Sequence, residues 1–115
     1  MSSKDNFFTP QYTDQAVKLA EKHSDFVMGF ICQQRLSQNP SLIHMTPGVQ
    51  LAAGGDALGQ VYDTPDNVVA VRQCDVIIVG RGIYGAPDVV EASKKYQEAG
   101  WQAYRARIGS SASKL

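Results

Sequence analysis

The chain has 115 residues, and its Lys and Arg side chains balance its Asp and Glu side chains, so the formal net charge is zero. This balance gives no reason to expect a nucleic acid or an anionic membrane surface as partner. No apolar run is long enough to predict a membrane span, and the length suits one small domain with its own core. The cysteines Cys32 and Cys74 fit no zinc or redox spacing, so we expect buried, reduced thiols.

The first half of the chain predicts one helix and two strands. Thr9 is a suitable N-cap for a helix over residues 10–23, and the proline that follows it suits the first turn. The apolar run 26–31 predicts a buried strand, in which Gly29 indicates a close approach or a bend. A second short strand is expected over residues 42–45.

The second half predicts a loop, a short helix, a strand and a long helix. The Gly- and Ala-rich connection 50–62 is typical of a functional or disordered loop, and its glycines would let it move as a lid. Thr-Pro-Asp then starts a short helix that ends near residue 72. The unbroken β-branched run 76–79 predicts a strand buried on both faces. A helix from Pro87 onward and a disordered tail over 109–115 complete the chain.

Strands that alternate with helices favour an α/β domain with a parallel sheet. The aromatic residues Phe26, Phe30, Tyr96 and Trp101 are expected in its core. Both histidines, His23 and His44, are expected to be structural, and His44 has no acidic or cysteine neighbour at metal-ligand spacing.

The sequence Gly80-Arg81-Gly82 directly follows the predicted strand 76–79. Two glycines permit a sharp turn, and the arginine between them offers a planar cation with several donors. A buried strand that delivers such a turn just before a helix is a candidate site for a phosphate or a carboxylate. The alternative is an ordinary turn with a solvated arginine, and this stretch alone does not separate the two interpretations.

Three stretches together resemble one family, orotidine 5′-phosphate decarboxylase. They are Leu42-Ile43-His44-Met45-Thr46-Pro47-Gly48-Val49, Gly54-Gly55-Asp56-Ala57-Leu58-Gly59-Gln60-Val61-Tyr62-Asp63-Thr64-Pro65 and Asp75-Val76-Ile77-Ile78-Val79-Gly80-Arg81-Gly82-Ile83. The strand, the glycine loop with Gln-x-Tyr and the strand with Gly-Arg-Gly occur in the family's order. The resemblance extends from Met1 to about Ile108.

The resemblance implies a (β/α)₈ TIM barrel, usually a homodimer, that converts orotidine monophosphate to uridine monophosphate and carbon dioxide in de novo pyrimidine biosynthesis. The family uses no metal and no cofactor. Residues 1–108 would form the C-terminal portion of the barrel, with 26–31, 42–45 and 76–79 as strands six to eight, followed by a flexible tail at 109–115.

The resemblance also suggests which residues bind the substrate. Arg81 and the backbone of Gly80 match the positions that hold the phosphate, and Gln60 and Tyr62 match lid residues that close over it. Ser2 matches a serine that bonds the pyrimidine. This agrees with a general rule, because barrels often bind phosphate in the loops after their seventh and eighth strands.

Two positions qualify this assignment of the lid. Pro47 matches the start of the mobile segment beside the base, but Val61 stands where close relatives often have glutamine. Its side chain is expected to matter less than those of Gln60 and Tyr62.

The family's catalytic Asp-x-Lys-x-x-Asp motif does not occur in this sequence. Lys22-His23-Ser24-Asp25 supplies half of it, but at a predicted helix end, where a solvated surface charge is the simpler interpretation. We therefore assign no catalytic residue and expect this chain alone to be inactive. Its partners would be orotidine or uridine monophosphate and either the remainder of the barrel or a second copy. The alternative is a non-catalytic module that binds a phosphorylated ligand or a partner chain.

Two features of the sequence bear on localisation. The first residues lack the apolar core of a signal peptide, so a cytoplasmic protein is expected. The final Ser113-Lys114-Leu115 matches the peroxisomal import tripeptide, which gives a second possibility beside a chance ending.

Overall fold

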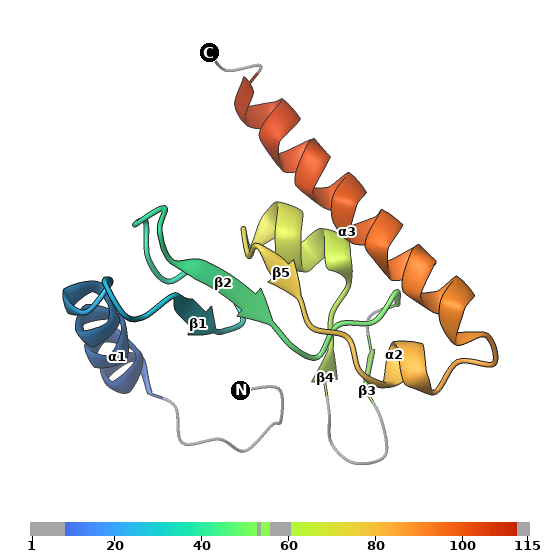
Figure 1. Cartoon of the computed structure of the whole chain (residues 1–115), viewed down its shortest axis with the longest axis horizontal. Helices are drawn as coiled ribbons and strands as arrows, with labels where there is room; N and C mark the ends of the chain where they lie inside the picture. The colour runs from blue at the N-terminus through green and yellow to red at the C-terminus, as the bar shows by residue number, and fades with distance from the viewer. Residues whose placement is uncertain (1–8, 53, 56–60, 113–115) are drawn as a thin grey trace.

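A computed structural model describes residues 9–52, 54–55 and 61–112. Three α-helices, one π-helix and five short strands lie in these ranges (Figure 1). In chain order they are α1 (Pro10–Lys22), β1 (Gly29–Ile31), β2 (Ile43–Thr46), β3 (Gly54–Gly55), β4 (Val61–Tyr62), η1 (Asn67–Val71, the π-helix), β5 (Val76–Ile77), α2 (Arg81–Tyr84) and α3 (Val89–Ala112).

The parallel α/β arrangement is confirmed. The strands β1, β2 and β5 form a parallel sheet in that order, with Phe30 opposite His44 and Thr46 opposite Ile77. The strands β3 and β4 form a separate antiparallel pair beyond the end of β2 (Figure 1). A three-stranded parallel sheet is consistent with part of a TIM barrel, and the assignment to strands six to eight stays a prediction.

Gly29 is required by a close approach between β1 and β2. A Cβ atom at Gly29 would lie 2.7 Å from the backbone N and C atoms of Ile43 and still closer to its carbonyl oxygen. Contacts that short do not occur, so any side chain here would push the two strands apart. The close approach predicted at Gly29 is therefore confirmed.

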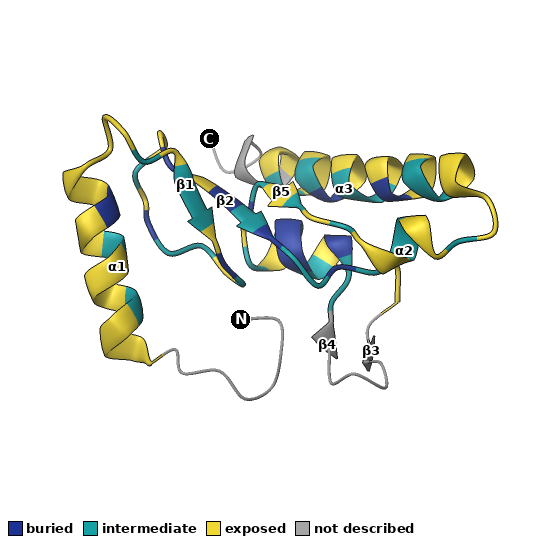
Figure 2. Cartoon of the chain, turned by 60° about the horizontal axis from the view of Figure 1, so that its bottom comes forward, coloured by how far each residue is buried: buried dark blue, intermediate teal, exposed yellow. Residues whose placement is uncertain are grey.

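One face of the sheet is buried under η1 and α3. Paired residues of neighbouring strands share a face, and Cys32, His44 and Thr46 on this face are almost fully buried. Val68 and Val69 of η1 and Ala103 of α3 complete the core on that side. Figure 2 shows the buried residues gathered between the sheet and these two helices.

The other face of the sheet is apolar and exposed. Ile31 is 50 % exposed and Val76 43 % exposed, and Ile43 and Ile78 on the same face are exposed as well. The prediction that strand 76–79 is buried on both faces is therefore wrong for the chain as it stands. The side chains of Val76 and Ile78, on the second face of this apolar run, are left exposed by the described residues.

Two of the aromatic residues expected in the core lie outside it. Phe26 is 89 % exposed and Trp101 54 % exposed, whereas Tyr96 is buried and Phe30 packs against the core cluster. Phe26 precedes the first paired residue, because β1 begins only at Gly29. Trp101 lies on the exposed face of α3, and the sequence did not show that the helix would leave this face uncovered.

The predicted helix starts are confirmed at three residues. Thr9 Oγ1 accepts the backbone N–H of Tyr12 at 3.1 Å, and Asp88 Oδ1 accepts that of Glu91 at 3.0 Å. Thr64 Oγ1 accepts the N–H of Asn67, but the helix that follows becomes the π-helix η1.

The last helix is longer than expected. α3 continues to Ala112, so the first four residues of the segment predicted as a tail are helical, and residues 113–115 lie outside the described ranges. Gly109 lowers helix propensity by about 1 kcal/mol relative to alanine, but helix extension is less costly than nucleation, so a long preceding helix can continue through it.

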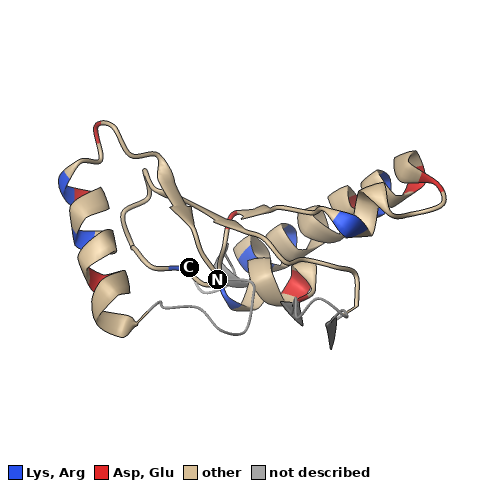
Figure 3. Ribbon diagram, turned by 90° about the horizontal axis from the view of Figure 1, so that it is seen from below, with Lys and Arg blue, Asp and Glu red and all other residues tan. Residues whose placement is uncertain are grey.

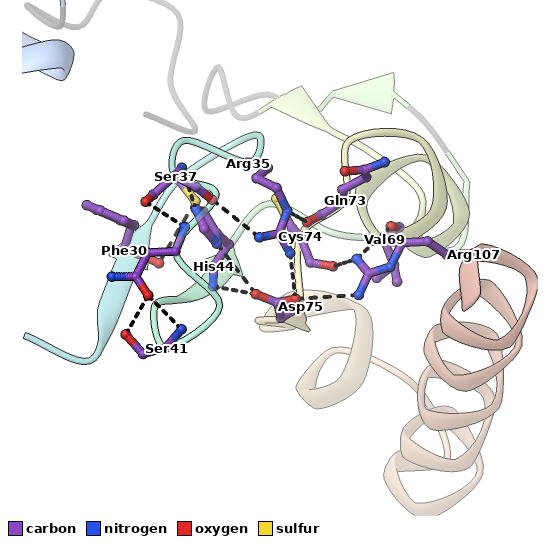
Figure 4. Close-up of polar contacts among 12 residues, drawn as sticks. Phe30, Arg35, Ser37, Ser41, His44, Val69, Gln73, Cys74, Asp75 and Arg107 are labelled. Carbon is purple, nitrogen blue, oxygen red and sulfur yellow. Dashed lines mark hydrogen bonds and ion pairs between the residues drawn. The ribbon is translucent and has the colours of Figure 1, made fainter. Parts of the chain in front are cut away.

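A polar cluster joins the elements at the amino ends of the strands (Figure 4). The Asp75 carboxylate accepts the backbone N–H of His44 at 2.8 Å and pairs with Arg35 at 3.1 Å. Arg107 of α3 lies 3.5 Å from the same carboxylate and donates to the carbonyl oxygens of Val69 and Cys74. One carboxylate therefore connects β2, β5, α3 and the loop after β1.

Ser37 extends this cluster toward α1. Its hydroxyl donates to Glu21 at 2.6 Å, and its backbone N–H donates to Nε2 of His44 at 3.2 Å. Since Nε2 accepts a hydrogen bond, the proton of the neutral ring is on Nδ1, which lies 3.5 Å from Asp75. Burial, and after it the nearby Arg35, lower the pKa of His44, while Asp75 opposes both. The neutral ring is therefore the form that the fold stabilises.

Charged side chains of both signs are interspersed along α1 and α3 (Figure 3). Within the described ranges, no helix combines the length and the apolar character that crossing a bilayer needs.

We expect Asp75→Asn to lower the free energy of unfolding by about 2 kcal/mol, because it removes the charge from hydrogen bonds to Arg35 and Arg107. Urea denaturation followed by circular dichroism measures this loss. Asp25→Asn is the matched control, since Asp25 is exposed at the end of α1. Equal stability of the two variants would show that the cluster contributes little.

Stability should also depend on the protonation of His44. Its pKa is lowered on folding from the ordinary value of 6.5, so the unfolded chain binds more protons as the pH falls through about 6.5. The free energy of unfolding is then complete above that pH and declines below it. Urea denaturation from about pH 7.5 to about pH 5.5 should show this slope, flattened in His44→Gln and retained in His23→Gln. An unchanged slope in His44→Gln would assign it to other groups.

Candidate functional site

The candidate site lies where the parallel strands end. Because β2 and β5 are adjacent and parallel, the segments that follow Thr46 and Ile77 leave the sheet at the same edge (Figure 1). The first segment carries Pro47 and the connection to β4, and the second carries the Gly-Arg-Gly turn. Two stretches far apart in the sequence are thereby brought to one edge, opposite the Asp75 cluster.

The second of these segments turns directly into a short helix. Gly80 is the N-cap of α2, and its carbonyl oxygen accepts the N–H groups of Ile83 at 2.9 Å and Tyr84 at 3.1 Å. These bonds use N–H groups at the start of the short helix α2. Arg81, the first residue of α2, is exposed. A glycine turn and a guanidinium therefore occur together at this edge, the pattern that the sequence analysis expects of a site for a phosphate or a carboxylate.

The two glycines of this turn lie against tyrosine rings. A Cβ atom at Gly82 would lie 2.7 Å from Cζ of Tyr96 and nearer still to its hydroxyl, and one at Gly80 would lie 3.4 Å from the Tyr84 ring. The sequence analysis expected these glycines to permit a sharp turn. For Gly82 the structure gives a different reason, because the space is filled by Tyr96 of α3.

The first segment is closed at its base. The Gln50 N–H donates to the Asp63 carbonyl oxygen at 2.9 Å, and the Asp63 N–H donates to that of Gly48 at 2.9 Å. Val49 and Asp63 form a parallel bridge at the same place. The connection between Gln50 and Asp63 therefore begins and ends at positions that are hydrogen-bonded to each other.

Asp63 fixes this return point through its side chain. Its carboxylate accepts the backbone N–H of Thr64 at 2.9 Å and two bonds from the Asn67 amide at 2.8 Å each. Arg72 pairs with it at 2.7 Å. These bonds hold the start of η1 against the connection. The sequence analysis missed this role, although an aspartate before Thr-Pro with Asn four residues later is a recognisable capping pattern.

The structure places only part of the predicted site. Gly80 and Arg81 lie at the edge described above. Ser2 and Gln60 lie outside the described residues, and Tyr62 is described only through its backbone, opposite Gly54. Their predicted contacts with substrate therefore stay predictions.

The remaining candidate groups are not gathered into a reactive site. Cys32 and Cys74 are free and buried, as expected, and hydrogen bonding to Cys74, with burial, raises the pKa of the Cys32 thiol. Lys22 and Asp25 are exposed near the end of α1, as the surface interpretation predicted. Among the described residues, no three His, Cys, Asp or Glu side chains cluster as metal ligands.

Comparison with known proteins agrees with the resemblance. Residues 1–96 match the family model described as orotidine 5′-phosphate decarboxylase / HUMPS family. The chain is 51 % identical to uridine 5′-monophosphate synthase of Bos taurus over 108 residues, which are 94 % of this chain and 22 % of that protein. It is 52 % identical to orotidine 5′-phosphate decarboxylase of Phycomyces blakesleeanus over 111 residues, covering 94 % and 42 %.

A third relative, orotidine 5′-phosphate decarboxylase of Aureobasidium pullulans, is 49 % identical over 106 residues, covering 90 % of this chain and 39 % of that protein. The chain thus spans less than half the length of these relatives. Because the family model covers most of the sequence, the chain belongs to the orotidine 5′-phosphate decarboxylase / HUMPS family.

Proposed function

We propose that this chain forms the part of an orotidine 5′-phosphate decarboxylase that holds the phosphate and the base of the nucleotide. The observation that carries the proposal is the Gly80-Arg81 turn, which stands at the carboxyl edge of the sheet beside the connection that follows β2. Barrels of this kind often bind phosphate in the loops after two neighbouring strands. Relatives that are about half identical to this chain over the aligned segment are named as decarboxylases of orotidine 5′-phosphate.

In this proposal Arg81 supplies a bidentate charged contact to the phosphate, and the backbone of Gly80 helps to cradle it. Gln60 and Tyr62 would close over the phosphate, and Ser2 would bond the pyrimidine. The phosphate is remote from the bond that breaks. Binding energy from such a remote group can serve the reaction by assembling the reactive site, so its loss lowers turnover as well as affinity. The sequence lacks Asp-x-Lys-x-x-Asp, so the reacting groups would come from elsewhere.

The partner that fits the exposed sheet face is the remainder of a barrel. The face is apolar, with Ile43 near its centre, and no strand in the described part of the chain pairs with the outer edge of β1 or of β5. A groove of about 970 Å³ runs beside β5, lined by Val76, Ile83, Tyr96 and Trp101 among others. Additional strands and helices would bury this face, pair with β5 and fill the groove. The relatives are more than twice as long as the matched segment, which supports the same partner.

A second candidate is a non-catalytic module that binds a phosphorylated ligand. The absence of Asp-x-Lys-x-x-Asp from the sequence favours it for the isolated chain. The two proposals share the Arg81 site and differ in whether a complementary chain restores decarboxylation.

Calorimetric titration with uridine monophosphate tests the phosphate site. We expect the chain to bind and Arg81→Ala to weaken binding by roughly tenfold to a hundredfold, since a charged hydrogen bond contributes about 1.5–3 kcal/mol. Arg105→Ala, an exposed arginine on α3, is the matched control and should bind as the unaltered chain does. Uridine without phosphate should not distinguish the variants. Equal affinity of Arg81→Ala and the unaltered chain for the monophosphate would refute the site.

Complementation tests the partner. The chain is co-expressed with the part of the Phycomyces blakesleeanus decarboxylase that it does not match. We expect the two to copurify and to consume orotidine monophosphate together but not separately. Ile43→Arg on the open sheet face should abolish copurification and activity. Val71→Arg, at an exposed position of η1, should abolish neither. Copurification without activity would favour the non-catalytic module, and failure of both would contradict the proposed partner.

A further inference from the structure

A tyrosine of α3 lies between the two segments that form the candidate site. Tyr96 is buried, and its hydroxyl oxygen accepts the backbone N–H of Leu51 at 3.1 Å. Leu51 is the first residue past the closed base formed by Gln50 and Asp63. The same hydroxyl and the adjoining ring carbons occupy the space where a Cβ atom at Gly82 would lie. One side chain therefore contacts both the segment after β2 and the turn after β5.

From this arrangement we infer that Tyr96 is a positioning residue for phosphate binding, because it sets the distance between Leu51 and the Gly80-Arg81-Gly82 turn. The inference rests on the proposed function, and Tyr96 itself need not touch the ligand. Its ring limits how far the turn can approach α3, and its hydroxyl holds the other segment to the same helix. The guanidinium of Arg81 and the backbone after β2 would then face the phosphate from fixed positions.

The chemistry of a phenol suits both contacts. A buried hydroxyl requires a hydrogen-bond partner, and the Leu51 N–H supplies one outside the regular strands. A phenylalanine would keep the ring beside Gly82 but remove the hydroxyl, the atom nearest to the Gly82 Cβ position, and leave the Leu51 N–H without this acceptor. The contact with Leu51 can therefore be tested by Tyr96→Phe alone, and the contact with Gly82 by adding a substitution at Gly82.

The first test compares Tyr96→Phe with the unaltered chain. We expect the Leu51 amide to exchange its hydrogen about three- to tenfold faster, as loss of one neutral hydrogen bond predicts, and affinity for uridine monophosphate to fall by a similar factor. The His44 amide, bonded to Asp75, should exchange at an unchanged rate. Tyr104→Phe is the matched control, since Tyr104 lies two turns further along α3 and stacks on Trp101. Unchanged Leu51 exchange in Tyr96→Phe would overturn the inference.

The second test uses the contact with Gly82. Gly82→Ala places a methyl group against Tyr96, so we expect it to shift the amide resonances of the turn and to weaken nucleotide binding. Adding Tyr96→Phe removes the hydroxyl, the nearest atom, and should recover part of both effects. If the two substitutions changed nucleotide affinity additively, the contact between Gly82 and Tyr96 would not position the turn, which would overturn the inference.

The two proposals fail in different ways. If the unaltered chain binds uridine monophosphate and Tyr96→Phe binds it equally well, the phosphate site stands and the positioning role is wrong. If the unaltered chain does not bind, the phosphate site of the isolated chain is wrong. The Leu51 exchange rate and the resonances of Gly82 then decide whether Tyr96 joins the two segments.

Discussion

The carboxylate of Asp75 is the interaction on which the described fold depends most. It accepts the His44 N–H within the sheet and pairs with Arg35 from the loop after β1 and with Arg107 from α3. Through these three partners the Asp75 carboxylate joins neighbouring strands of the sheet to α3, the helix that covers them. If the carboxylate were lost, the donors that these partners direct at it would be left without an acceptor.

This cluster and the candidate site lie at opposite ends of the same strands. The amino edge carries the internally paired charges, and the carboxyl edge carries the Gly-Arg-Gly turn and the closed base at Asp63. The strands between them are very short, so little chain separates the two edges. Loops that carry binding residues at the carboxyl edge of a hydrogen-bonded scaffold are common in parallel α/β folds.

Much of the architecture was predictable from local signals. Thr9 and Asp88 cap helices, Gly29 marks a close approach, and parallel pairing follows from the order of elements. The exposure of Phe26 and Trp101 was not predictable, because an apolar pattern shows which face can be buried and not whether anything covers it. The same limit explains the open face of the strand 76–79.

The candidate site divides in the same way. The Gly80-Arg81 turn was identified from its residues, since a glycine turn with a cation after a strand is a local pattern. Tyr96 was missed as a site residue because its contacts with Leu51 and Gly82 join distant positions. Asp63 was missed although its bonds to Thr64 and Asn67 follow a local pattern. Residues that position a site are set by tertiary contacts and carry little signal in one sequence.

The register of the parallel sheet has a consequence for the order in which such a protein folds. The strands β1 and β2 pair across the loop 32–42, and β2 and β5 pair across the longer connection 47–75, part of which is closed at Asp63. The first pairing requires the smaller loop closure and the second is the longer-range step, so β1 and β2 are expected to pair first. Within a longer polypeptide this sheet would behave as one cooperative folding unit. Its open apolar face would then act as a template on which the other strands dock.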